Sequence, residues 1–232
     1  MSNYQRIRQE AYEANMQLPA LGLVLFTFGN VSVADQRSQV FAIKPSGVPY
    51  DQLSPAKMVI VDFEGNTIEG DLRPSSDTKT HAVLYKNWNM LGAIVHTHST
   101  YATAWAQAQR DIPIFGTTHA DHNTVDIPCA APMSDEMIKG DYEHETGYQI
   151  INCFNERQLD PTEVEMMLVA NHAPFAWGNN GAKAVYNAAV LEQVAHMAWL
   201  TEHINPNAPR LQQSLIEKHY RRKHGDGAYY GQ

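Results

Sequence analysis

The sequence has little cysteine, no long apolar segment and no excess of positive charge. Its 232 residues include two cysteines, Cys129 and Cys153, too few for a disulfide framework, so we expect a reducing compartment. No stretch approaches the roughly 20 apolar residues of a membrane-spanning helix, and the first ten residues lack a signal-peptide core. With 17 basic against 25 acidic side chains and no basic-aromatic stripe, nucleic-acid binding is not expected. We therefore expect a cytoplasmic protein without membrane or nucleic-acid partners.

What the sequence does contain is enough apolar material for a core, and many histidines. Apolar residues make up 44% of the chain, and we find no internal repeat, low-complexity segment or linker. We therefore expect one domain over residues 1–232. Eleven histidines beside two cysteines indicate imidazole chemistry, either acid–base catalysis or a metal site.

Strands are predicted first as a meander and then in alternation with helices. The expected strands are 23–28, 31–34, 40–43, 58–62, 67–69, 93–98, 112–115, 165–170 and 174–177. The expected helices are 3–17 (stopped by Pro19), 76–88, 99–108, 144–156, 181–203 and 208–223. This order predicts an α/β fold, with helices packed on a mixed sheet.

The best candidate metal ligands are His96 and His98 in the segment Val95-His96-Thr97-His98. Side chains alternate along a strand, so both imidazoles face one side and Thr97 faces the other. Two imidazoles on one face of a strand can bind one metal ion. The alternative interpretation is two polar residues on the solvent face of an edge strand.

Two further residues could complete such a site. Asn171-His172 directly follows the strand-like EMMLVA segment, and Asp77 lies at the start of the helix predicted at 76–88. Three histidines and a carboxylate suit zinc, although imidazole also binds other divalent transition metals. Taken singly, His172 also fits a turn histidine and Asp77 a helix cap. His144-Glu145 begins like a zinc-protease helix, but the second histidine is missing.

Three small polar turns indicate a phosphate site. They are Gly29-Asn30, Lys44-Pro45-Ser46-Gly47 and Pro74-Ser75-Ser76. Hydroxyl groups, free backbone N–H groups and a helix N-terminus all bind phosphate well. The sequence contains neither a P-loop nor a GxGxxG motif, so a nucleotide is not the expected ligand.

Eight segments occur together in an order that resembles the class II aldolase/epimerase family. They are GNVS (29–32), IKPSGV (43–48), RPSSDT (73–78), GAIVHTHS (92–99), GTTHAD (116–121), IPC (127–129), HAPFAWG (172–178) and KHYRRKHGDGAYYGQ (218–232). The resemblance covers essentially the whole chain. It implies a single-domain, three-layer α/β/α fold with a central mixed, largely antiparallel sheet.

Within the family, the chain is most similar to the sugar-phosphate epimerases of pentose and ascorbate catabolism. That resemblance implies a zinc-dependent enzyme, with one Zn²⁺ per subunit, that interconverts L-ribulose 5-phosphate and D-xylulose 5-phosphate at C4. It also implies a homotetramer with each site at a subunit boundary, completed by a neighbour's C-terminal tail. The family leaves two alternatives: a sugar-phosphate aldolase of the fuculose-1-phosphate type, and a non-catalytic adducin-like interaction domain.

Carried over position by position, the resemblance assigns a role to sixteen positions, all of them in the eight segments. The implied metal ligands are Asp77, His96, His98 and His172. The implied substrate and phosphate contacts are Gly29, Asn30, Lys44, Ser46, Gly47, Ser75 and Ser76. The implied acid–base residues are Asp121 and Tyr230, and the implied boundary residues are Thr117, His219 and Arg222.

Two positions depart from the family pattern. Relatives carry aromatic residues after the catalytic aspartate, whereas this chain has His122-Asn123-Thr124. Relatives carry glycine after the third histidine ligand, whereas this chain has Ala173. The first departure is expected to alter substrate fit, and the second to strain the backbone if that glycine needs a positive φ.

Overall fold

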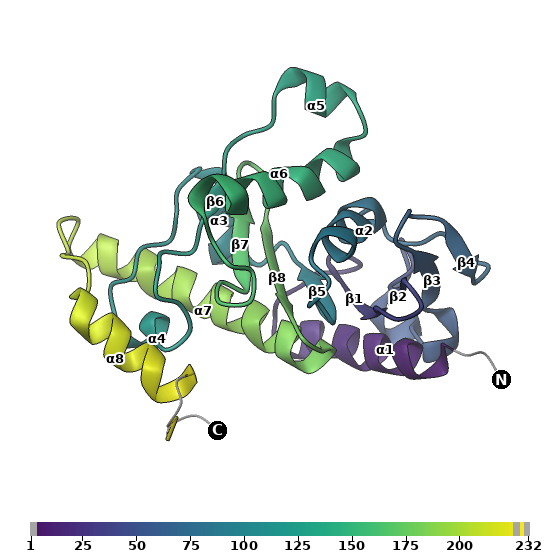
Figure 1. Ribbon diagram of the computed structural model, residues 1–232, viewed down its shortest axis with the longest axis horizontal. Coiled ribbons are helices and arrows are strands. Elements are labelled where there is room, and N and C mark those ends of the chain that lie inside the picture. The colour runs from purple at the N-terminus through teal and green to yellow at the C-terminus, as the bar shows by residue number, and fades with distance from the viewer. Residues whose placement is uncertain (1–3, 225–227, 230–232) are drawn as a thin grey trace.

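The computed structural model describes residues 4–224 and 228–229 (Figure 1). Its helices are α1 (Gln5–Ala20), α2 (Thr78–Asn87), α3 (Thr100–Gln107), α4 (Thr117–Ala120), α5 (Asp135–Lys139), α6 (Tyr142–Arg157), α7 (Gly181–Ile204) and α8 (Gln213–His224). Its strands are β1 (Asn30–Asp35), β2 (Val40–Ile43), β3 (Val59–Asp62), β4 (Thr67–Glu69), β5 (Ala93–His96), β6 (Cys129–Ala130), β7 (Met166–Val169) and β8 (Pro174–Gly178).

All these strands form one sheet in the order β4-β3-β2-β1-β5-β8-β7-β6. Neighbouring strands run antiparallel except for β6 and β7, which are parallel. The mixed, largely antiparallel sheet expected from the sequence is therefore confirmed. The central strand β5 pairs with β1 on one side and β8 on the other, which places its end at His96 between two chain segments.

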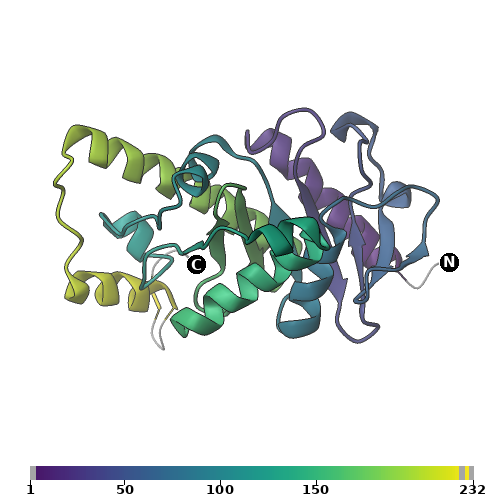
Figure 2. The same cartoon turned by 90° about the horizontal axis from the view of Figure 1, so that it is seen from above.

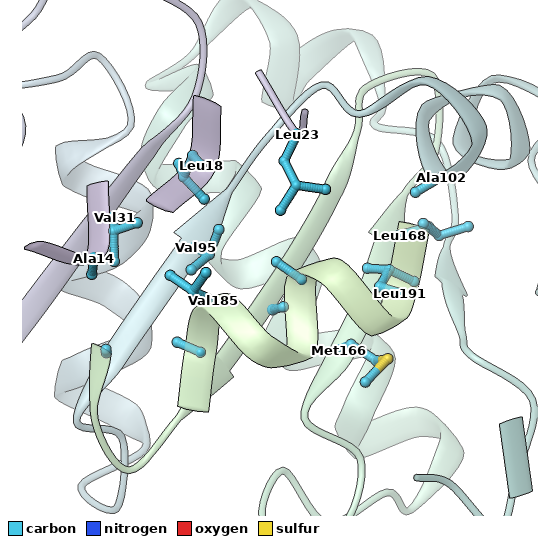
Figure 3. Packing of buried hydrophobic residues seen from close by; sticks show 14 of the residues in the cluster. Ala14, Leu18, Leu23, Val31, Val95, Ala102, Met166, Leu168, Val185 and Leu191 are labelled. Carbon is cyan, nitrogen blue, oxygen red and sulfur yellow. The ribbon is translucent and has the colours of Figure 1, made fainter. Parts of the chain in front are cut away.

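Helices cover both faces of the sheet and make a three-layer structure. The first layer, α1, α3 and α7, packs on side chains such as Val31, Val95 and Leu168 (Figure 3). The opposite layer, α2 and α6, packs on the other face, which includes Ile94 and Met167. Successive residues of β5 and β7 alternate between the two clusters, because side chains alternate across a strand. Both strands are thus buried on both faces, which explains their unbroken apolar sequences.

The predicted strand at 23–28 is wrong: the segment is a loop, and it exposes Leu25 and Phe26. Its apolar and aromatic composition imitates a strand, but the chain has left-handed φ values of 69° at Gly22, 53° at Phe26 and 72° at Gly29. Such backbone angles interrupt extended structure. β1 therefore begins at Asn30, directly after this loop.

Other predicted boundaries also need correction. The segment 112–115 forms only an isolated bridge from Ile112 to Ile127, because Pro113 has no N–H group and the Ile114 N–H donates to the Asp126 carboxylate. Pro19 does not stop α1 but lies inside its last turn. The last helix begins at Gln213, five residues later than expected. The short elements α4, α5 and β6 were not expected from the sequence.

The view from above shows the α7–α8 end of the molecule and the α1–β4 end at opposite sides (Figure 2). β5, which carries His96, lies between these ends (Figure 1). Within the described residues, no helix is both long and apolar enough to cross a membrane.

Candidate metal and substrate site

Three histidines meet where β5 ends and where β7 turns into β8. His96 is the last residue of β5, His98 follows two residues later, and His172 lies in the β7–β8 turn. One ring nitrogen from each lies within 4.8 Å of the others. The expected shared face of His96 and His98 is therefore present. Antiparallel pairing of β5 with β8 brings in His172, because His96 lies opposite Phe175, three residues beyond it.

The β7–β8 turn gets its shape from Asn171 and not from Ala173. Asn171 has a left-handed φ of 60°, whereas Ala173 is absent from the residues of positive φ. The Val169 N–H donates to the Ala173 carbonyl at 3.0 Å and closes the turn. Asparagine tolerates left-handed backbone better than most residues. The expected strain at Ala173 is therefore not found.

The three histidine rings can offer nitrogen lone pairs to a metal ion. His96 is buried and its Nδ1 lies 3.0 Å from the Pro174 carbonyl, so an N–H there leaves Nε2 free to bind a metal. Burial lowers the pKa of His98, and burial with the neighbouring His96 and His98 lowers the pKa of His172 to about 4. Neutral imidazole is the form that binds metal. The buried Nδ1 of His172 has no hydrogen-bond partner within the described residues, which fits a polar ligand at this place.

Asp77 lies beside the histidines, at the N-cap position of α2. Its carboxylate makes no capping hydrogen bond; instead it accepts from Asn30 Nδ2 at 2.6 Å and from Ser75 Oγ at 3.3 Å. Burial raises the pKa of Asp77, but His96, His81 and the Asn30 hydrogen bond outweigh burial and leave the pKa below its ordinary value. An ionised carboxylate next to three imidazoles favours a cation. Within the described residues, however, the compact ligand group contains the three histidines without Asp77.

A pocket of about 540 Å³ contains all the predicted ligands and substrate contacts. The predicted residues that line it are Gly29, Asn30, Lys44, Ser46, Gly47, Ser75, Ser76, Asp77, His96, His98 and His172. Pro45, part of the expected phosphate turn, lines it too, and the sequence interpretation missed four further lining residues: Thr27, Phe28, Tyr142 and Glu143. Residues spread over 140 positions of sequence therefore share one cavity.

The hydroxyl-bearing side of the pocket consists of two joined loops. The Ser46 N–H donates to the Arg73 carbonyl and the Ser75 N–H to the Lys44 carbonyl, at 2.9 and 3.0 Å. Lys44 is buried, its Nζ donates to the Thr27 carbonyl at 3.1 Å, and burial lowers its pKa. A cation beside serine hydroxyls and the first turn of α2 is an arrangement that suits an anion.

Gly29 allows the loop before β1 to approach the histidines. Its φ is +72°, and a Cβ there would lie 2.6 Å from Val24 Cγ1 and 3.0 Å from the His96 carbonyl oxygen. No larger residue fits without movement, because real Cβ atoms essentially never approach so closely. This turn therefore aims Asn30 at Asp77.

Tyr142 and Glu143 were missed because α6 begins two residues before the predicted helix at 144–156. Thr80 Oγ1 donates to the Glu143 carbonyl at 2.6 Å and ties the start of α6 to α2. The ring of Tyr142 lies 6.2 Å from that of His172. Burial, Glu143 and Asp77 raise the pKa of Tyr142. The available signal was the segment Asp141-Tyr142-Glu143, an N-cap candidate followed by an aromatic residue and an acid.

Asp121, Thr117, His219 and Arg222 come together at a different place, between α4 and α8. The Asp121 carboxylate accepts from His219 Nδ1 at 2.9 Å and from Arg222 Nε and Nη2 at 3.2 and 3.1 Å. Burial raises the pKa of Asp121, but Arg222 and His219 outweigh it and hold the pKa below its ordinary value. Thr117 begins α4 and its carbonyl accepts from the Asp121 N–H. Within the described residues, none of the four lines the histidine pocket of the same chain. Tyr230 lies outside the described residues.

His122, one of the two departures, lies in a cationic neighbourhood. Its Nε2 is 3.4 Å from Lys223 Nζ, and its ring centroid is 5.6 Å from that of Tyr186. Burial and the nearby Lys223 and Lys183 lower its pKa to about 3. His122 is therefore neutral at neutral pH, beside the Asp121 carboxylate.

Comparisons with known proteins agree with this architecture. The family model of the class II aldolase and adducin N-terminal domain matches residues 9–199. A solved L-fuculose 1-phosphate aldolase is 24% identical with a TM-score of 0.77, over 95% of this chain and 96% of that one. The L-fuculose 1-phosphate aldolase of Glaciozyma antarctica PI12 is 16% identical with a TM-score of 0.75, over 94% and 81%. YgbL of Klebsiella pneumoniae is 22% identical with a TM-score of 0.71, over 94% and 99%. The solved structures share the fold, and the family match over most of the sequence shows that the chain belongs to the class II aldolase and adducin N-terminal domain family.

Proposed function

We propose that the protein is a zinc-dependent epimerase that interconverts L-ribulose 5-phosphate and D-xylulose 5-phosphate at C4. One observation carries the proposal: the histidine triad lines the same pocket as Lys44, Ser46 and Ser75, the residues that we propose for the phosphate. A pocket with a cation site at one side and a phosphate site at the other fits a short sugar phosphate. His96, His98 and His172 would hold the ion, with Asp77 beside them.

The chemistry of the substrate calls for cleavage and re-formation of a C–C bond. The carbonyl of a 2-ketopentose 5-phosphate is at C2, so the hydrogen at C4 is not acidic. In a retro-aldol step a base takes the proton of the C4 hydroxyl, and the C3–C4 electron pair moves to C3. Glycolaldehyde phosphate and the enediolate of dihydroxyacetone result. The aldehyde then rotates, and the bond re-forms on its other face.

The pocket residues have separate tasks in this reaction. Ser46, Ser75, Ser76 and Lys44 would hold the phosphate, so that the aldehyde fragment rotates without escaping. A bound divalent ion supplies Lewis-acid stabilisation of the negative charge that develops on oxygen. The two faces of the aldehyde need two proton-transfer groups, for which we propose Asp121 and Tyr230.

Asp121 lies away from the histidine pocket of its own chain, which supports a shared site. We propose a homotetramer in which Asp121, with Thr117, His219, Arg222 and the C-terminal tail, faces the histidine pocket of a neighbouring subunit. In such an assembly the Arg222–His219 pair would hold the Asp121 carboxylate in place.

A sugar-phosphate aldolase is the second candidate, because three of the structures with this fold are named as L-fuculose 1-phosphate aldolases. Glu143 also lines the pocket, which makes its carboxyl group a further candidate base. An adducin-like interaction domain, by contrast, has no need of the three assembled histidines. The residue Asp77 after Pro-Ser-Ser favours the epimerase, because the aldolase type carries glutamate there.

Incubation of the zinc-loaded protein with L-ribulose 5-phosphate tests the proposal. We expect D-xylulose 5-phosphate to form, and the His96→Asn variant to lose both the bound metal and the activity. Accumulation of dihydroxyacetone and glycolaldehyde phosphate without D-xylulose 5-phosphate would establish the aldolase instead. A wild-type protein that contains no stoichiometric divalent metal would favour the interaction domain.

A further inference from the structure

We propose that Glu192 of α7 is a positioning residue for His98 and acts through the first turn of α3. The inference rests on the metal site proposed above, and assigns a task to a carboxylate outside the pocket. Glu192 touches neither the pocket nor a ligand ring within the described residues.

Glu192 caps α3 from another helix. Its Oε1 accepts from the Tyr101 N–H and its Oε2 from the Ala102 N–H, both at 2.9 Å. Ser99, at the N-cap position, makes no capping hydrogen bond with its own side chain. The first N–H groups of a helix have no partner inside the helix, and a carboxylate there also interacts favourably with the helix dipole. The α3 N-terminus thus depends on a side chain 90 residues further along.

The direction of the His98 ring depends on the chain on either side of it. β5 ends at His96, and the His96 ring is fixed by the Pro174 carbonyl. No hydrogen bond to the His98 ring is present in the described part of the chain. His98 lies between the end of β5 and α3, which begins at Thr100. Its backbone is therefore held upstream by the sheet and downstream by Glu192.

α7 provides a rigid base for this cap. Leu191, Val194 and Ala195 flank Glu192 and are buried in the core cluster that includes Val95 of β5. Trp105 Nε1 of α3 donates to the Ala195 carbonyl at 3.0 Å. A shift at Glu192 is therefore transmitted to the first turn of α3 and, two residues before it, to His98.

The other end of α3 offers a matched control. Glu202 of α7 accepts from Arg110 Nη1 and Nη2 at 2.9 and 2.6 Å, just beyond the end of α3. Glu192→Gln and Glu202→Gln thus make the same chemical change on one helix, each at a contact with the α3 region. Only the first contact adjoins a proposed metal ligand.

Zinc affinity, measured by competition with a chromophoric chelator, tests the proposal without reference to turnover. We expect Glu192→Gln to weaken Zn²⁺ binding by up to about tenfold, the low end of the effect of losing a direct hydrogen-bond partner of a ligand, because Glu192 acts on His98 only through α3. Glu202→Gln should leave Zn²⁺ binding unchanged. The visible absorption of the Co²⁺-loaded protein should change in Glu192→Gln alone, because it reports ligand geometry. Hydrogen exchange at the Tyr101 and Ala102 amides should accelerate in the same variant.

The possible outcomes distinguish a failure of this inference from a failure of the proposed function. A wild-type protein that binds no Zn²⁺ or Co²⁺ at the triad would overturn both. A wild type that binds zinc, with Glu192→Gln of equal affinity and equal Co²⁺ spectrum, would overturn the role of Glu192 alone. If Glu192→Gln does not fold, Glu192→Asp keeps the charge on a shorter side chain. Glu192→Asp should bind zinc more weakly than the wild type. A Glu192→Asp variant with the zinc affinity and Co²⁺ spectrum of the wild type would contradict the inference.

Discussion

At the scale of single residues, burial fixes the charge of several histidines. His81, His119 and His122 all have a pKa far below the ordinary value, with burial as the largest cause in each case. His81 lies on α2, His119 on α4 and His122 in the turn after α4, and none is a proposed metal ligand. Neutral histidine inside the protein and charged histidine in the unfolded chain make stability depend on pH.

His119 gives this dependence a testable form. It is 2% exposed, and burial lowers its pKa to about 4. The unfolded chain, with a histidine pKa of about 6.5, binds more protons between these values, so the free energy of unfolding falls as pH drops through that window. Between about pH 7 and pH 5, we expect the free energy of unfolding of His119→Leu to fall by about 2 kcal/mol less than that of the wild type. Urea unfolding at the two pH values measures this difference. A wild-type slope in His119→Leu would contradict the argument.

At the scale of elements, two turns lead into the pocket with similar backbone angles and different surroundings. Gly29 (φ +72°) precedes β1 and its missing Cβ would collide with Val24 and the His96 carbonyl. Gly47 (φ +70°) follows β2 and has nothing within 4 Å of such a Cβ. Alanine substitutions at these two glycines therefore distinguish the cost of backbone strain alone from the cost of strain together with a steric collision.

We expect Gly47→Ala to lower the free energy of unfolding by about 1 kcal/mol, which is the strain of left-handed backbone alone. Gly29→Ala should lower it by about 3 kcal/mol, because the collision adds to the strain. It should also reduce zinc binding, since the contacted carbonyl belongs to His96. Equal losses of stability in chemical denaturation would show that the contact with β5 is unimportant.

Local sequence patterns could identify some of these elements and not others. The His96–His98 pair was predictable because strand alternation is a property of adjacent residues. The position of His172 beside them depends on the pairing of β5 with β8, which no spacing in the sequence encodes. The loop at 23–28 was mistaken for a strand because the left-handed φ of Phe26 leaves no mark in a run of apolar residues. Glu143 was missed for a smaller reason, an error of two residues in the start of α6.

At the scale of the whole molecule, the proposed site needs two subunits, and mixed oligomers can test this. We expect His98→Ala and Asp121→Asn to be inactive alone, because each lacks one part of every site. Co-expressed in one cell, they should form oligomers in which about a quarter of the sites carry neither substitution.

The matched control mixes two single variants whose substitutions fall in the same pocket. Mixed oligomers of His98→Ala and His172→Ala should stay inactive, because both histidines belong to the same chain's pocket. Activity of Asp121→Asn alone would remove this carboxylate from the reaction. A lack of recovery in the His98→Ala and Asp121→Asn mixture would place Asp121 in its own chain's site.

The two outer strands of the sheet have a consequence for how copies of the protein can meet. β4 has three residues and β6 has two, so each border of the eight-stranded ladder offers few unpaired backbone groups. Short outer strands are a common protection against growth of a sheet from one molecule into the next. Concentrated solutions should therefore resist fibril formation.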